Sequence, residues 1–188
     1  VGWSWFTAAR PGIAHLALAG LGRLTPLTGV ITQNVDGLHQ AAGSAPVVDL
    51  HGSLARVVCL GCGVLSSRAG LQDELLALNP GITARLGELS EQARTAPDGD
   101  AEVEGMTGFT YPACPVCGGM PKPDVVYFGE NARREVVEAA NALFDAAEVL
   151  PVLGSTLTVM SGLRFARQAV KHGKAVIIAG RRLPRADD

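Results

Sequence analysis

The sequence predicts an α/β protein in which a Rossmann-like parallel sheet carries an inserted small zinc-binding module. After residue 120, short β-branched runs alternate with amphipathic stretches of helical spacing, a pattern typical of parallel strands joined by right-handed crossovers. All four cysteines fall into two C-x-x-C pairs. The chain has 188 residues, 47% of them hydrophobic, which is enough for one sizeable core and a small appended module.

The first half of the chain predicts one helix and two strands. Residues 13–22 (IAHLALAGLG) follow Pro11 and carry apolar side chains at helical spacing. The segment 27–37 (LTGVITQNVDG) indicates a buried strand that ends in a polar loop, and 47–53 (VVDLHGS) indicates a second strand that ends at His51. Both strands therefore deliver polar residues at their carboxyl ends.

Between the cysteine pairs we expect a helix over 71–80 (LQDELLALNP), followed by a mobile, Gly- and acid-rich loop over 96–105 (APDGDAEVEG). The second half predicts alternating elements: strand and loop over 123–130, helix over 131–147, strand and Gly-Ser-Thr loop over 148–156, helix over 161–174 and strand over 175–180. We assign 1–55 and 122–188 to the Rossmann-like domain and 56–121 to the zinc module.

Three polar clusters follow predicted strands: residues 32–36, 51–53 and 154–156. In an open parallel sheet the ligand crevice lies beyond the carboxyl ends of the strands. We therefore expect these clusters to meet in one cleft.

The cysteine spacing predicts a structural zinc ion bound by four thiolates, Cys59, Cys62, Cys114 and Cys117. Gly63, Gly118 and Gly119 follow the pairs and let the backbone turn around the metal. A four-sulfur site has no open coordination position, so this metal should not activate water. Two disulfides or a redox dithiol are the alternative interpretations.

Composition excludes several classes of partner. The net charge is −2, which gives no broad positive field, so direct nucleic-acid binding is not expected. No apolar run is long enough for a membrane span, and no signal peptide is recognisable. Paired cysteines that bind metal favour a reducing cytoplasm. The oligomeric state is left open by the sequence.

Four segments occur in the order and spacing of the sirtuins, zinc-containing NAD-dependent protein deacylases that this chain resembles over essentially its whole length. They are TQNVDGLHQAAG, VVDLHGS with a cysteine pair close behind, PKPDVVYFGE and VLGSTLTVMSG. The long insert and the Ser-Gly after GSTLTVM are similar to the mitochondrial-type subgroup linked to lipoamidase and ADP-ribosyl transfer activity. The resemblance implies a Rossmann-like fold, NAD, one structural zinc ion and acyl-lysine protein substrates.

In this family the acyl oxygen of a modified lysine attacks the ribose carbon of NAD, nicotinamide leaves, and a histidine then removes a proton from a ribose hydroxyl. The resemblance makes His51 that general base. Histidine suits the task because its ordinary pKa lies near neutrality. Without the resemblance, a lone histidine is more often structural, and we interpret His39 in that way, as holding its loop by a hydrogen bond.

The resemblance also implies the binding residues. Gln33, Asn34 and Asp36 correspond to the nicotinamide and ribose pocket, although an Asx turn explains Asn34 and Asp36 equally well. The cofactor-binding set further contains Gly154, Ser155, Thr156 and Gly180. The substrate-binding set contains Val125, Val126, Phe128, Gly129 and Glu130, with residues 158–162 as the partner segment of the peptide cleft. Phe128 is expected to line an acyl-lysine tunnel or, alternatively, to be a core aromatic.

The chain departs from the family pattern at several positions. The first strand, the Gly-Ala-Gly turn and any G-x-G-x-x-G are missing, so we expect a fragment of a longer protein with impaired NAD affinity. Ala179, Gly180 and Arg181 stand where the family usually has Asn on the adenine side. Pro151 interrupts a predicted central strand, which places that strand at an edge or breaks its ladder.

Two rival functions remain at this stage. A zinc-ribbon module that recognises a protein or a nucleic acid without catalysis would need only the cysteines. The basic residues near them are too sparse for a phosphate-binding patch. A nicotinamide dehydrogenase with a structural zinc ion would need the missing glycine fingerprint.

Overall fold

The computed structural model describes residues 3–84 and 107–180. The chain forms two compact units: unit 1 comprises residues 1–10 and 53–125, and unit 2 comprises 11–52 and 126–188. The polypeptide therefore passes from one unit to the other three times. Residues 1–10 belong to the unit that contains the cysteines, whereas the sequence-based division had placed them with the Rossmann-like domain. The predicted loop at 96–105 lies outside the described residues.

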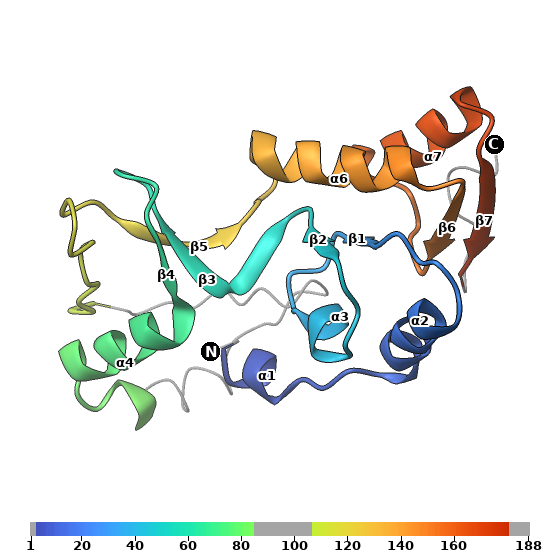
Figure 1. The fold of residues 1–188 in the computed structure, drawn as a ribbon. Coiled ribbons are helices and arrows are strands. Elements are labelled where there is room, and N and C mark those ends of the chain that lie inside the picture. Colours follow the sequence, from blue (N-terminus) through green and yellow to red (C-terminus); the bar gives the residue numbers. More distant parts are fainter. Residues whose placement is uncertain (1–2, 85–106, 181–188) are drawn as a thin grey trace. The chain divides into compact units, whose positions relative to one another are not determined.

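Unit 2 contains two parallel strand pairs (Figure 1). Strand β1 (Val30–Thr32) pairs with β2 (Val47–Asp49), with Thr32 opposite Asp49. Strand β6 (Val149–Leu153) pairs with β7 (Ala175–Ala179). The sequence predicted one continuous sheet, but within the described residues no ladder joins the two pairs. Parallel pairing within each pair is confirmed, and it aligns the carboxyl ends of the paired strands at one edge.

Four helices accompany these strands: α2 (Ile13–Leu24), the short α3 (Leu38–Ala41), α6 (Arg134–Ala146) and α7 (Met160–Lys171). Helix α6 packs on β1 and β2, and α7 packs on β6 and β7 (Figure 1). Three of the four were predicted; α3 is a single turn too short to give a periodic signal.

One hydrophobic core joins both strand pairs. Its buried members are Leu50, Ala140, Phe144, Phe165 and Ala169, and residues from β1, β2, β6 and β7 pack against them. Leu50, which directly follows β2, is only 1% exposed. The α6 and α7 aromatics meet in this core, with ring centroids 5.7 Å apart for Phe144 and Phe165. The shared core explains why the strand pairs belong to one unit without a common ladder.

Pro151 is accommodated at a strand edge, one of the two outcomes that the sequence left open. Strand β6 pairs only with β7 in the described structure, and the Gly154 amide donates to Ala179 O at 2.8 Å. Successive residues of a strand direct their amides to opposite edges, so the nitrogen of Pro151 faces away from β7. The missing N–H therefore removes no bond from this ladder.

Unit 1 contains a three-stranded sheet of order β4-β3-β5, formed by β3 (Gly52–Cys59), β4 (Leu65–Ser67) and β5 (Pro121–Val125). Helix α1 (Trp3–Ala8) and helix α4 (Arg68–Leu78) complete it, with the Arg68 guanidinium 4.6 Å from the Trp3 ring centroid. The sequence assigned the strand near 123–126 to the parallel sheet. That assignment is wrong for β5, because its ladder partner is β3 of unit 1.

None of the helices within residues 3–84 and 107–180 combines the length and the apolar character that crossing a bilayer requires.

We predict that Leu50→Ala lowers the free energy of unfolding of unit 2 by about 2–5 kcal/mol, because it empties a fully buried site between two strand pairs. Urea denaturation followed by far-UV circular dichroism measures the change. The matched control is Leu24→Ala, which removes the same atoms from a side chain that is 85% exposed. Equal destabilisation by the two variants would contradict the assigned core.

Candidate functional site

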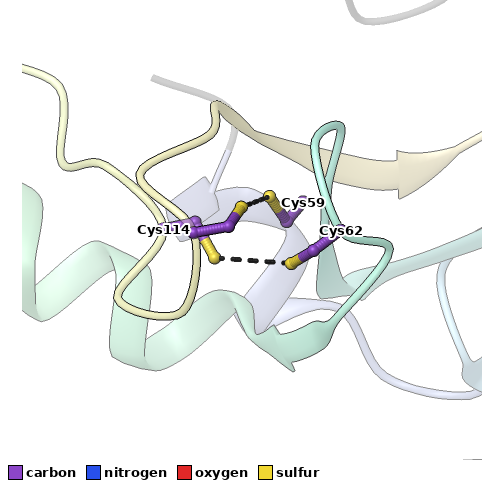
Figure 2. A group of neighbouring side chains, drawn as sticks. Cys59, Cys62 and Cys114 are labelled. Carbon is purple, nitrogen blue, oxygen red and sulfur yellow. Dashed lines mark hydrogen bonds between the residues drawn. The ribbon is translucent and has the colours of Figure 1, made fainter.

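The four cysteines converge on one point in unit 1. Figure 2 labels three of them, Cys59, Cys62 and Cys114. Cys59 is the last residue of β3, Cys62 lies in the turn that follows, and Cys114 and Cys117 lie on the segment that leads into β5. All four Sγ atoms lie within 4.8 Å of one another. Cys59 and Cys114 are buried, and their two partners are exposed.

The sulfur geometry fits a tetrahedral metal ion. All four cysteines are free, and the closest contacts cross between the pairs: Cys59 Sγ is 3.5 Å from Cys117 Sγ, and Cys62 Sγ is 3.9 Å from Cys114 Sγ. Sulfurs bound about 2.3 Å from a central Zn²⁺ lie roughly 3.8 Å from one another. These cysteines would therefore hold a structural zinc ion, and the alternative of two disulfides does not match the cysteines of this structure.

Two glycines allow the cysteine turns to approach each other closely. A Cβ added to Gly119 would lie 3.0 Å from Cys59 Sγ, 3.1 Å from Cys117 Sγ and 3.2 Å from the Cα of Gly61. The sequence had singled out Gly63, Gly118 and Gly119. Gly63 and Gly118 do adopt positive φ, at 72° and 73°, whereas Gly61 was missed because its role is contact and not backbone conformation.

Backbone amides point at the sulfurs and favour thiolates. The Gly61 amide donates to Cys59 Sγ, and the Gly119 amide donates to Cys117 Sγ. The Cys62 amide and then that of Gly61 lower the pKa of Cys59 to about 6. The Gly119 amide also acts to lower the pKa of Cys117, but hydrogen bonds with the other thiols outweigh it and raise that pKa to about 12. Binding of a cation by these four thiols would release protons.

His51 occupies the carboxyl end of the β1–β2 pair in unit 2. The Leu50 amide donates to Thr32 O at 2.8 Å, which continues the parallel ladder one residue beyond β2. Gln33 follows Thr32 and His51 follows Leu50, so the ladder brings these two residues to the same edge. The His51 carbonyl in turn accepts from the Val126 amide at 2.9 Å, which fixes the backbone on its other side.

Ser161 connects the two predicted side chains. Its Oγ lies 2.9 Å from His51 Nε2 and accepts from Gln33 Nε2 at 2.7 Å. Ser161 lies in the first turn of α7, and both partners are partly buried. The sequence placed residues 158–162 in a peptide cleft but gave Ser161 no role of its own, because its partners are distant in sequence.

Burial lowers the pKa of His51 below the ordinary value of 6.5, and a hydrogen bond with the backbone of Gln33 opposes this shift. Neither influence comes from a charged side chain. The imidazole is therefore neutral near pH 7, and a neutral imidazole is the form able to accept a proton.

The predicted loop after β1 forms an Asx turn. Asp36 Oδ1 accepts from the Leu38 amide at 3.0 Å, Gly37 has a φ of 69°, and helix α3 follows. The Asn34 amide donates to Thr32 Oγ1, and its own side chain is exposed. The Asx-turn interpretation is thus confirmed for Asp36 but not for Asn34, whose exposed side-chain amide stays accessible to a ligand. No hydrogen bond within the described residues joins Asn34 or Asp36 to His51.

The predicted loop after β6 has a strained backbone. Gly154 has a φ of 67°, and Leu157 has a φ of 52° although it carries a side chain and is buried. Ser155 Oγ accepts from the Leu157 amide, and Thr156 Oγ1 lies 3.0 Å from Thr158 Oγ1. Non-glycine residues at positive φ concentrate at binding sites, which agrees with the functional interpretation of this loop.

The predicted substrate segment spans the boundary between the units, since Val125 ends β5 in unit 1 and Val126 begins the second part of unit 2. Residues 127–130 form a turn in which the Glu130 amide donates to Tyr127 O, and Gly129 has a φ of 88°. Phe128 is 96% exposed, so its interpretation as a core aromatic is wrong.

Two further predictions concern single residues. Gly180 is exposed and ends the described part of the chain after β7. His39 was expected to hold its loop by a hydrogen bond. Its ring instead packs against His15 at a centroid distance of 4.7 Å, and its Nδ1 is buried without a hydrogen-bond partner among the described residues, so that expectation is wrong for Nδ1.

The fold and the site define an α/β protein of the Rossmann-like class with a four-cysteine metal module. The Sir2 family model matches residues 3–161 of the chain. The chain therefore belongs to the Sir2 family, and the resemblance noted in the sequence is confirmed.

Curated relatives and solved structures agree with this assignment. NAD-dependent protein deacetylase 1 of Streptomyces coelicolor is 52% identical over 189 residues, and the protein of the same name from Mycobacterium avium is 50% identical over 187. A structure of Sir2Tm with a propionylated peptide covers the whole chain at 27% identity, with a TM-score of 0.75. A structure of Sir2 with a p53 peptide and NAD+ covers 97% of it, also at 27% identity, with a TM-score of 0.73.

The chain spans only part of these proteins. It covers 61% of the Streptomyces coelicolor protein and 66% of the Mycobacterium avium protein, while both alignments include all of this chain. The two structures are covered to 66% and 63%.

We predict that Cys114→Ser abolishes stoichiometric zinc binding, because it removes one of four ligands from a closed site. Metal content after dialysis, measured by inductively coupled plasma mass spectrometry, is the readout. Thermal unfolding should show loss of unit 1 structure both in this variant and after chelation of the wild type. Retention of one zinc ion per chain in the variant would contradict the assigned ligand set.

We further predict that Gly119→Ala weakens zinc binding at least tenfold, because the added methyl group would meet two sulfur atoms and the Gly61 backbone. Competition with a chromogenic chelator measures the affinity. The control is Gly70→Ala in α4. The new Cβ would lie 3.8 Å from its nearest neighbour, an ordinary van der Waals distance, and alanine favours the helix. If both variants bind zinc equally, the close packing of the turns has no bearing on the site.

Proposed function

We propose that this chain acts as an NAD-dependent protein-lysine deacylase that transfers the acyl group of a modified lysine to ADP-ribose and releases nicotinamide. The single observation that carries the proposal is the neutral His51 imidazole, held at the end of a parallel strand pair beside Gln33 in a chain of the Sir2 family. The names of the relatives and the peptide and NAD+ in a similar structure support it.

His51 is the proposed catalytic base: its Nε2 would take the proton of a ribose hydroxyl, with the Ser161 O–H turned away from that nitrogen when the sugar is bound. A base must be unprotonated at the working pH, and burial keeps this imidazole in that form. Its two anchors, Ser161 at Nε2 and the Gln33 backbone, restrict the direction in which the ring can face. Restriction of the ring is the main contribution of the protein to such a proton transfer, because efficiency depends on alignment.

The proposed NAD-binding residues lie on loops that follow strands. The side chains of Gln33 and Asn34 offer amide groups to a carboxamide or to ribose hydroxyls, and Asp36 favours positive charge that develops on the sugar. Gly154, Ser155, Thr156 and Gly180 follow β6 and β7, where Gly permits close backbone approach and hydroxyls donate to a phosphate. When bound, NAD supplies the sugar that accepts the acyl group and nicotinamide as the leaving group.

The substrate is proposed to lie along residues 125–130, where an extended peptide adds backbone hydrogen bonds. The exposed Phe128 ring is available to an acyl-lysine side chain. Zinc has no part in the chemistry of this proposal, since four thiolates leave no open coordination position, and it stabilises unit 1. The proposed activity also includes ADP-ribosyl transfer, to which the mitochondrial-type subgroup that the sequence resembles is linked.

We predict that His51→Ala lowers nicotinamide release from NAD and an acyl-lysine peptide by 10²–10⁴-fold, the range of general-base catalysis. The protein is expressed with whatever residues flank this sequence in its gene, and both nicotinamide and peptide mass are followed. The control is His172→Ala, which removes an exposed imidazole at the end of α7. Wild-type turnover in His51→Ala would remove His51 from the reaction.

We also predict the pH dependence of kcat/KM for the peptide. Protonation of His51 abolishes its action as a base, and its pKa lies below 6.5 in the folded protein. Between about pH 7 and pH 6.5, kcat/KM should therefore be constant. It should decline only below pH 6.5. An acid limb with its midpoint above pH 6.5 would contradict the buried, neutral imidazole.

A further inference from the structure

Ser161 has an unusual position between two groups of the proposed site. A single hydroxyl oxygen lies 2.7 Å from Gln33 Nε2 and 2.9 Å from His51 Nε2, so it connects the ends of both strands of the β1–β2 pair. The two partners are 128 and 110 residues away in the sequence. Helix α7 thus contributes a contact that the strands themselves do not provide.

With a neutral His51 ring, one arrangement of protons satisfies both partners of Ser161. The Gln33 amide nitrogen has protons and no lone pair to offer, so Ser161 Oγ accepts from it. The single hydroxyl proton of Ser161 is then free to be donated to His51 Nε2. Nε2 accepts a hydrogen bond only when the ring is neutral. The other ring nitrogen then carries the proton and donates it in the hydrogen bond with the Gln33 backbone. Gln33 therefore contacts this network at both its side chain and its backbone.

The next residue makes the approach of α7 possible. A Cβ added to Gly162 would lie 2.9 Å from Gln33 Oε1 and 3.3 Å from its Cδ. Any side chain at position 162 would push the Gln33 amide away from Ser161. The Ser-Gly pair at the start of α7 therefore places the hydroxyl and leaves space for the amide to reach it.

We infer that Ser161 is a positioning residue that holds the His51 ring in its neutral form, with Nε2 as the acceptor, and aligns Gln33 beside it. Its importance for turnover rests on the proposed function. Burial is the first cause of the lowered His51 pKa, and the role of Ser161 rests on the 2.9 Å contact between its Oγ and Nε2.

The direct test is titration of the His51 imidazole by NMR in isotope-labelled protein, which requires no turnover. Ser161→Ala removes a donor that stabilises only the neutral ring, so the pKa of His51 should rise toward 6.5. Ser161→Thr keeps the hydroxyl and should remain near the wild-type value. The matched control is Ser44→Ala, which removes a buried hydroxyl that has no hydrogen-bond partner among the described residues. An unchanged His51 titration in Ser161→Ala would overturn the inference.

Kinetics with NAD and an acyl-lysine peptide provide the second readout. Ser161→Ala should lower kcat about tenfold, leave KM for the peptide within a factor of about three, and move the acid limb of kcat/KM to higher pH. Ser161→Thr should restore most of kcat. Gly162→Ala, which displaces Gln33 without touching the hydroxyl, should lower kcat in the same manner. Wild-type kcat in Ser161→Ala would overturn the inference.

The two proposals fail in different ways. A wild-type protein that releases no nicotinamide, but whose His51 pKa rises in Ser161→Ala, would overturn the proposed function while supporting the positioning contact. An active wild type whose kcat and His51 titration do not respond to Ser161→Ala would overturn the positioning role alone.

Discussion

The parallel pairing of β1 and β2 is the constraint on which the proposed site depends. The register sets Thr32 beside Asp49, and the Leu50 amide extends the ladder by donating to Thr32 O. Burial of the Leu50 side chain in the core fixes the strand end against α6 and α7. Gln33 and His51, the next residue on each strand, are then neighbours, and the His51 ring forms a hydrogen bond with the Gln33 backbone. A one-residue slip would turn Leu50 outward and remove both.

The two units are stabilised by different means. Unit 2 has a continuous core that includes aromatic side chains from two helices. The Lys174 ammonium donates to the carbonyls of Phe144 and Asp145 in the last turn of α6 and to that of its C-cap residue, Ala147. Unit 1 has a short sheet. Its two cysteine turns are in close contact, with Gly61 and Gly119 packed against the sulfur atoms of Cys59 and Cys117. Such a module depends on metal to offset its chain entropy, whereas unit 2 depends on buried apolar area.

The sequence predicted most elements and the four-cysteine cluster, because each has a local signal. C-x-x-C spacing, helical periodicity over 131–147 and 161–174, and polar residues after β-branched runs all lie within short windows. What it missed depends on distant contacts. The pairing of β5 with β3 and the bridge from Ser161 to Gln33 and His51 each join residues far apart in the chain. Gly61 and Gly162 were overlooked because the atoms that a Cβ would meet at these positions belong to residues far away in the sequence.

Pro151 affects what the outer edge of β6 is able to do. Its nitrogen faces that edge and has no proton to donate, so any strand that adds there forms a ladder with one bond missing. An unpaired edge with apolar neighbours is otherwise a template for self-association into aggregates. Within the described residues, Pro151 therefore leaves the edge of β6 that faces away from β7 with one amide fewer to offer a further strand.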